Sequence, residues 1–78
     1  MSHREYVFNS FAAITEHDTN IINVNGIYVG VSGNIRVIAA DGSDTTFANV
    51  PVGFFPVYGP VIIHTDTTAT NMVALRSV

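Results

Sequence analysis

The sequence predicts an all-β protein, a small antiparallel sandwich or barrel of about six or seven short strands. The chain is rich in Val, Ile, Thr, Phe and Tyr, which favour strands, and it contains few runs of residues that favour helices. Turn-forming residues also recur at short intervals, as they do between the strands of small β proteins. These turn signals are HDTN at 17–20, NG at 25–26, SGN at 32–34, DGSD at 41–44, NVPVG at 49–53, GP at 59–60 and TDTTATN at 65–71.

The chain length allows one domain. Of the 78 residues, we assign 6–78 to a single β domain and 1–5 to a loose N-terminal arm. A domain of this size buries only about 60% of its unfolded surface, so its own core leaves it marginally stable. The absence of cysteine excludes disulfides, thiolate metal ligands and a cysteine nucleophile. Oligomerisation is the remaining common route to stability.

The charge content points in the same direction. Only 12% of the residues are charged, against about 25% in an ordinary soluble domain, and 47% are apolar. We therefore expect part of the surface to be buried against copies of the chain or against another protein. A net charge of −3 with no lysine argues against a nucleic-acid partner.

No segment predicts a membrane partner. The chain has no run of about 18 apolar residues that could cross a membrane as a helix. The N-terminal sequence MSHREYVF also lacks the apolar core of a signal peptide. We expect synthesis in a cytoplasm.

The stretch GIYVGVSGNIRV at 26–37 contains three glycines, which occur both in phosphate-binding loops and in hairpins. A dinucleotide or phosphate loop needs a helix after its glycines, and the GxxG clamp of RNA-binding domains needs helices and basic neighbours. The residues that follow Gly33 are instead the β-branched run NIRVIAA. The stretch therefore predicts a β-hairpin.

The hairpin register predicts which residues share a face. A three-residue loop at 32–34, with Gly33 or Asn34 at positive φ, places Val31 opposite Ile35. Tyr28, Gly30, Arg36 and Ile38 then occupy the other face, which we consider a possible subunit interface, and Gly30 predicts a bulge or a close backbone approach. The predicted buried face consists of Ile27, Val29, Val31, Ile35, Val37 and Ala39.

The remaining elements follow in chain order. Asp41-Gly42 predicts a second hairpin, between RVIAA and DTTF. The prolines of VPVGFFPVYGPVIIH at 50–64 predict an edge or a bulged corner before pairing at 61–63. Phe54 and Phe55 beside them indicate either core packing or a subunit contact. The run NMVALRSV at 71–78 predicts a last strand.

Two pairs of residues could take part in metal binding. His17-Asp18 and His64-x-Asp66 each flank a turn, where Asp commonly bonds its own backbone. The sequence gives no reason for the two turns to meet, so turn chemistry is the favoured interpretation and whether they converge on an ion stays open.

The sequence contains no motif that indicates catalysis. No serine lies on a nucleophile elbow, and a domain this small leaves little room for a substrate pocket. We expect no enzymatic activity, no catalytic residue and no cofactor.

The loop at 65–70 is rich in threonine. Thr65, Thr67, Thr68 and Thr70 indicate a solvated loop with hydroxyl-to-backbone bonds. A carbohydrate-binding module, with Tyr28 or Tyr58 as a stacking platform, is an alternative.

The order of the motifs resembles that of a known family. HDTNII at 17–22, GIYVGVSGNIRV at 26–37, DGSDTTFANVPVGFFPV at 41–57 and TDTTATNMVAL at 65–75 resemble the small spike base proteins of gene transfer agents and related tailed phages. The YGPVIIH segment, with Pro60, departs from the pattern. The positions that match it are Asp18, Thr19, Tyr28, Gly30, Gly33, Thr46, Phe47, Val50, Pro51, Gly53, Thr67, Thr68, Ala69 and Thr70.

The resemblance implies a structural virion protein that seats a spike or fibre on a capsid vertex. Its partners would be copies of itself in a closed ring, with a pentamer favoured over a trimer, the major capsid protein, and a spike or fibre protein. It would be made in the cytoplasm of a bacterial host and located in the virion. A trimeric capsid cement protein is the alternative within this class. We expect Tyr28, Arg36, Ile38, Phe54 and Phe55 as possible interface residues.

Overall fold

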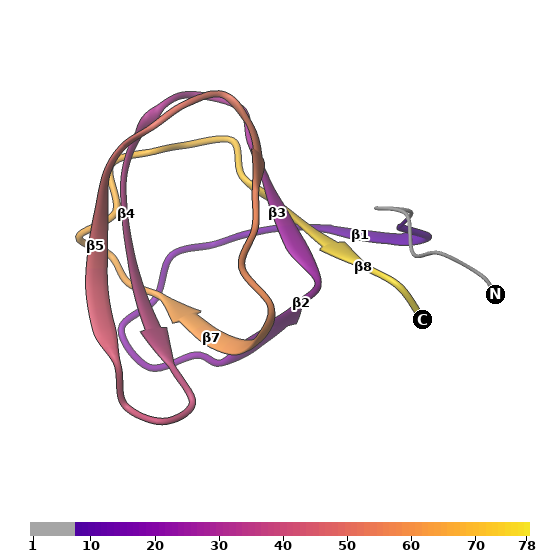
Figure 1. Ribbon diagram of the computed structural model, residues 1–78, viewed down its shortest axis with the longest axis horizontal. Helices are drawn as coiled ribbons and strands as arrows, with labels where there is room; N and C mark the ends of the chain where they lie inside the picture. The colour runs from indigo at the N-terminus through magenta and orange to yellow at the C-terminus, as the bar shows by residue number, and fades with distance from the viewer. Residues whose placement is uncertain (1–7) are drawn as a thin grey trace, which may run out of the picture.

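The computed structural model describes residues 8–78, which form an antiparallel β-sandwich of two four-stranded sheets (Figure 1). The predicted all-β sandwich is confirmed, with eight strands in place of six or seven. The arm expected at residues 1–5 lies outside the described residues. The strands are β1 (Ser10–Ala13), β2 (Ile22–Val24), β3 (Gly26–Val29), β4 (Gly33–Ala39), β5 (Asp44–Val50), β6 (Gly53–Phe55), β7 (Gly59–Ile63) and β8 (Val73–Arg76).

The strand order explains how the two sheets divide the chain. Sheet A has the order β1-β8-β3-β6, and sheet B has the order β2-β7-β4-β5. Side chains alternate across each strand, so one side of each sheet faces the other sheet and one side faces outward. The largest fully buried side chains are Ile27, Val29, Ile35 and Ile63, which come from β3, β4 and β7. The core therefore lies between the central strands of the two sheets.

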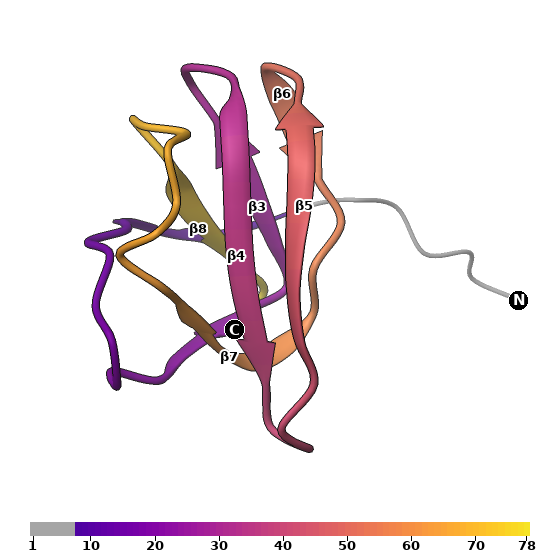
Figure 2. The same cartoon turned by 90° about the vertical axis from the view of Figure 1, so that its left-hand side faces the viewer.

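The predicted hairpin between β3 and β4 is wrong, although both strands exist. β3 pairs with β6 and β8, whereas β4 pairs with β5 and β7, so the two strands belong to opposite sheets. Their apolar side chains still point into one core, because each strand faces the other across the sandwich (Figure 2). Neither Gly33 nor Asn34 has positive φ, since the connection crosses between sheets and makes no tight turn.

The predicted buried face is only partly correct. Ile27, Val29, Ile35 and Val37 are buried, and Ala39 is half-buried. Val31 is 46% exposed, because it lies in the crossing between the sheets and forms an isolated bridge to Thr70.

The two glycines of the crossing are required by close backbone approaches. A Cβ at Gly30 would lie 2.6 Å from the carbonyl oxygen of Asn71, and a Cβ at Gly33 would lie 2.5 Å from the amide nitrogen of Ala69. The close approach predicted at Gly30 is therefore confirmed.

The remaining strands and turns agree with the predictions from the sequence. The Asp41-Gly42 hairpin joins β4 to β5, with Gly42 at a φ of 90°. The segment with the three prolines forms the edge strand β6 and then enters β7, which pairs with β4 at residues 61–63 as predicted. Pro60 lies opposite Asn23 of β2, before the pairing with β4 begins. The predicted last strand is β8.

Candidate interaction surface

Sheet A presents an apolar side to the outside. Each outward position of its four strands carries an apolar residue, a glycine or Tyr28, and none carries a charge. Three of these side chains are large and well exposed: Phe11 at 64%, Tyr28 at 44% and Phe54 at 43%. We call this surface the outer A face; it comprises Phe11, Ala13, Tyr28, Phe54, Val73 and Leu75.

The register of sheet A aligns these side chains in rows. Phe54 lies directly opposite Tyr28, and Tyr28 lies opposite Val73, which in turn lies opposite Ala13. Side chains directly opposite on one face of an antiparallel pair lie in contact distance. One row therefore crosses the sheet from β6 to β1 without a polar break other than the tyrosine hydroxyl.

A glycine shapes one end of this face. A Cβ at Gly26 would overlap the ring of Phe54, so the absence of a side chain there lets the ring lie over the backbone of β3. The ring of Phe8 packs on the same ring, with 6.0 Å between the two centroids. Aromatic rings thus gather over β3 and β6.

The structure separates the five residues expected at a subunit interface. Tyr28 and Phe54 lie on the outer A face, as that expectation requires. Phe55 is wrong as an interface residue: it is 8% exposed and packs edge-to-face on Phe47 with 5.2 Å between centroids. Arg36 and Ile38 point outward from sheet B, on the opposite side of the sandwich, because β3 and β4 are in different sheets.

The sequence interpretation missed four members of the outer A face. Phe11, Ala13, Val73 and Leu75 come from β1 and β8, at the two ends of the chain. The apolar pattern of VALR in β8 was visible in the sequence, but its outward side chains were not. Only the pairing of β8 with both β1 and β3 brings them beside Tyr28.

Sheet B presents a polar cluster centred on Arg36. Its guanidinium donates from Nε and Nη2 to the two carboxylate oxygens of Asp44, at 3.0 and 2.8 Å, and from Nη1 to Asp66 at 2.6 Å. These hydrogen bonds raise the pKa of Arg36 and lower the pKa of the Asp44 carboxyl. Since its donors are bonded within the chain, Arg36 is held in place as part of the sheet B surface.

The two turns with His and Asp do meet, although nothing in the sequence indicated that they would. The amide of His17 donates to the carbonyl of Ile63 at 2.9 Å, which brings the 17–20 turn beside the end of β7. Asp18 then accepts a 2.6 Å hydrogen bond from the Thr65 hydroxyl, which lowers its pKa, and lies 3.4 Å from Nε2 of His64.

Turn chemistry occupies most of these groups. Nδ1 of His17 accepts from the amides of Thr19 and Asn20, and Nδ1 of His64 accepts from the amide of Asp66. In the described part of the chain, no three His, Asp or Glu side chains are arranged to hold a metal ion.

The threonines have mainly structural contacts. Thr67 is buried, which corrects the expectation of a solvated loop at that position, and its hydroxyl accepts from the amide of Arg36 at 3.0 Å. The hydroxyl of Thr68 accepts from the amide of Asn34 at 2.8 Å. The expected hydroxyl-to-backbone bonds are therefore present and tie the loop after β7 to β4.

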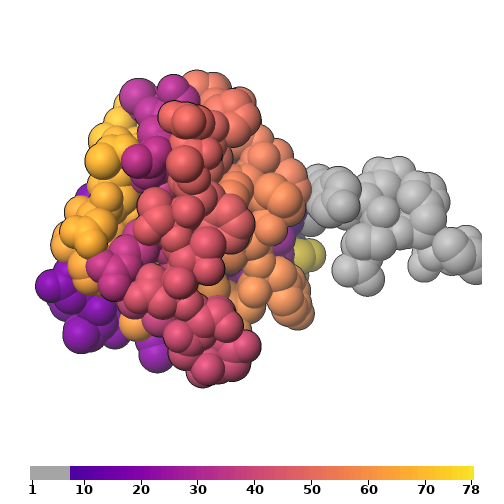
Figure 3. All heavy atoms as spheres, turned by 60° about the vertical axis from the view of Figure 1, so that its left-hand side comes forward, coloured from indigo at the N-terminus to yellow at the C-terminus, as the bar shows by residue number. Residues whose placement is uncertain are grey.

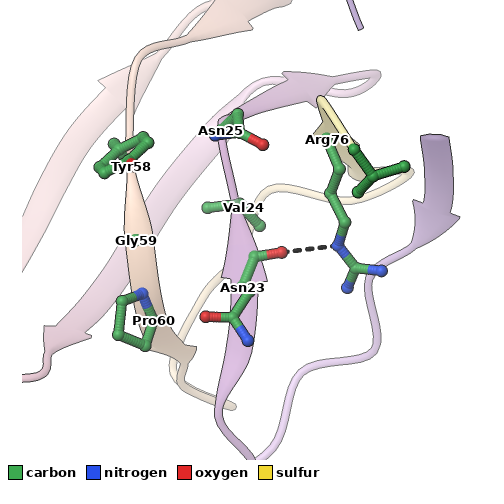
Figure 4. Close-up of a pocket in the computed structure, with 8 residues that line it drawn as sticks. Asn23, Val24, Asn25, Tyr58, Gly59, Pro60 and Arg76 are labelled. Carbon is green, nitrogen blue, oxygen red and sulfur yellow. Dashed lines mark hydrogen bonds between the residues drawn. The ribbon is translucent and has the colours of Figure 1, made fainter. Parts of the chain in front are cut away.

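The residues of the carbohydrate alternative do not come together. Tyr28 lies on sheet A, and Tyr58, 80% exposed, precedes β7 whereas the threonines follow it. Beside Tyr58 is a pocket of about 260 Å³ between β2, β7 and the end of β8 (Figure 4). Nε of Arg76 in this pocket donates to the carbonyl of Asn23 at 2.6 Å, so that donor is used within the fold.

Comparison of the chain with family models, curated proteins and solved structures finds no match. Residues 8–78 include no helix long and apolar enough to cross a membrane. The fold and the outer A face define the class of protein as a β-sandwich with an apolar, uncharged sheet surface.

Proposed function

We propose that this protein is a structural subunit of a phage or phage-like particle, an oligomeric base that seats a spike or fibre on a capsid vertex. The outer A face is the single observation that supports this proposal most strongly. A protein of this size has little reason to expose an uncharged sheet surface with Phe11, Tyr28 and Phe54 on it unless another surface covers it.

The chemistry of the outer A face fits contact with protein. Aromatic residues are enriched and charged residues are depleted at the centres of protein interfaces. The low overall charge and the resemblance of the motif order to spike base proteins support the same assignment. We assign the outer A face to the contact between copies in a closed ring, with five copies favoured over three.

The first experiment counts the copies. The purified chain is analysed by native mass spectrometry and by size exclusion with light scattering. Copy numbers in multiples of five support the vertex base, and multiples of three support the alternative cement protein. A ring contact is excluded if the chain forms no species larger than a dimer at micromolar concentration.

The second experiment tests the surface. Tyr28→Glu places a carboxylate in the middle of the apolar row and should dissociate the ring. Ile21→Glu is the control, because Ile21 is 66% exposed, lies outside the outer A face and precedes β2, which is at the opposite end of sheet B from β5. If the two variants have the same copy number as the unaltered chain, the outer A face is not the ring contact.

The third experiment tests the location. Antibody-gold labelling of particles in electron micrographs should place the label at capsid vertices, at the root of a spike or fibre. Label distributed over the capsid faces or along the tail would contradict the vertex assignment.

A further inference from the structure

The β5 strand has the longest edge in the described fold, and that edge is exposed. β5 spans seven residues at one end of sheet B, and residues 44–49 are all exposed. Figure 3 shows the red band of this strand running down the molecular surface. In sheet B its only hydrogen-bonded neighbour is β4.

The backbone groups on this edge belong to alternate residues. The amide of Ala39 donates to the carbonyl of Ser43 at 2.8 Å, and the register continues this ladder at two-residue steps as far as Phe47, after which it shifts at a bulge where Asn49 has a φ of 56°. In an antiparallel pair, the residues between these steps direct their N–H and C=O groups away from the partner strand. These outward-directed residues are Asp44, Thr46 and Ala48.

The other sheet edges are short or protected. β6 has three residues and lies between Pro51 and Pro56, which cannot donate to a ladder. β2 also has three residues, and the carbonyl of Asn23 within it accepts from Arg76. β1 has four residues.

Natural proteins protect long edges with charges, prolines, bulges or covering segments, since an open edge pairs with other chains. In the described fold β5 contains no proline, and its one bulge lies after Phe47, near the end of the strand, so residues 44–48 form a regular edge. Its only charged residue is Asp44, which is bonded to Arg36 of the same chain.

We propose that β5 pairs with β5 of a second copy of this chain, antiparallel about a two-fold axis. The second copy is the occupant because no other edge of the described sheets approaches the seven-residue length of β5. The pairing joins the two copies of sheet B into one continuous sheet. It does not depend on the proposed function, because it involves a different surface from the outer A face.

The positions of the outward backbone groups determine the register. Pairing all three of these residues requires Thr46 to face Thr46 of the second copy and Asp44 to face Ala48. This arrangement forms about six backbone hydrogen bonds and places no two like charges opposite each other. Shorter overlaps would leave some of these groups unpaired.

The side chains of β5 that face the core favour the same register. In this register Thr45 of one copy lies opposite Phe47 of the second copy. A cavity of about 170 Å³ opens on this side, lined by apolar groups that include Phe47, Val57 and Tyr58. Each copy would therefore contribute an aromatic ring toward the open side of its partner's sandwich.

The test uses Tyr28→Glu as the background, so that any ring contact through the outer A face is removed. In this background the chain should be a dimer. Adding Thr46→Pro removes the outward N–H at the two-fold axis while leaving the ladder to β4 intact, and should give a monomer. Adding Thr46→Val is the matched control, because it retains the N–H and should give a dimer.

A second variant covers the case in which Thr46→Pro does not fold, as judged by circular dichroism and cooperative unfolding. Thr46→Lys leaves the backbone unchanged and places two like charges side by side at the axis. It should raise the dimer dissociation constant at least about tenfold in sedimentation equilibrium.

The outcomes separate the two proposals. If the outer A face contacts a different protein, the unaltered chain is itself a dimer. If the outer A face forms a ring, the unaltered chain forms two rings joined through β5. In that case Thr46→Pro, made in the unaltered chain, leaves single rings. A Tyr28→Glu chain that is monomeric at about 100 µM overturns the β5 pairing. A dimer that persists in both the folded Pro and Lys variants overturns it as well.

Discussion

Arg36 and Asp44 are joined by two parallel hydrogen bonds from diagonal positions of β4 and β5, with donor-acceptor distances of 3.0 and 2.8 Å. Arg36 also donates to Asp66, which follows β7. The guanidinium of Arg36 thus links β4, β5 and the loop that follows β7. Because a bidentate pair has a fixed geometry, it orients both side chains on the outer surface of this sheet.

This pair gives a prediction for acid stability. The hydrogen bond from Arg36 lowers the pKa of Asp44 below its ordinary value of 3.8, and the hydrogen bond from Thr65 does the same for Asp18. The resulting stabilisation is complete above the ordinary value and is lost as the pH falls through the lower pKa of the folded state. The urea midpoint should therefore fall when the pH decreases from 5 to 2.

The Asp44→Asn variant checks the origin of this pH dependence. It should have a lower midpoint than the unaltered chain at pH 7 and a smaller decrease at acid pH. The effect should be modest, because both side chains are partly exposed and solvent screens the pair. An unchanged acid slope in Asp44→Asn would show that other carboxyl groups are responsible.

A single methyl group at Gly30 should destabilise the fold. Alanine in a strand is usually more stable than glycine. Here the new Cβ would lie 2.6 Å from the carbonyl oxygen of Asn71, so the two backbones must separate. We expect Gly30→Ala to lower the free energy of unfolding by about 1–3 kcal/mol. Ser32→Ala, at an exposed position nearby, is the control for urea denaturation and should have little effect.

The adjacent residues Phe54 and Phe55 provide a matched comparison of the two sides of β6. Phe55→Ala leaves a cavity in the core and should cost about 3–5 kcal/mol in the free energy of unfolding. Phe54→Ala removes the same atoms from a half-exposed ring and should cost much less in the monomer. Equal losses for the two variants would contradict the assignment of Phe54 to the outer side.

The hydroxyl of Thr67 should contribute more to stability than its neighbours do. Thr67→Val keeps the shape of the side chain but leaves the amide of Arg36 without its buried acceptor. The expected loss is about 1–3 kcal/mol, from thermal or urea denaturation. Thr70→Val is the control, since Thr70 is exposed and its hydrogen bonds with Val31 are made by backbone groups.

The local turn and strand signals were sufficient to predict part of the fold. Asp41-Gly42 predicted the β4–β5 hairpin, because a short turn that needs a positive φ is encoded in the residues that form it. The apolar residues of β3 and β4 were correctly expected to be buried, because alternation along a strand fixes which side chains share a face. Tyr28 was correctly placed on the face opposite the buried one, whereas the sequence left open whether Phe54 and Phe55 pack in the core or contact a subunit.

The partner of each strand was not predictable in the same way. Ile27 and Val37 fit equally well as neighbours in a hairpin or as facing residues in a sandwich, because both arrangements bury them together. The close approaches of Gly30 to Asn71 and of Gly33 to Ala69 exist only in the second arrangement. They require contacts between residues about forty positions apart, which no local pattern specifies.

The sequence by itself determined that the protein is an all-β domain, that its strands alternate apolar and outward residues, and that its low charge leaves apolar surface exposed. Only the tertiary structure decided which outward residues become neighbours. Phe11 and Leu75, from opposite ends of the chain, lie opposite each other on the outer A face, and β5 is left as the long edge of sheet B. The physical reason is that alternation is a property of one strand, whereas a surface depends on the pairing of several.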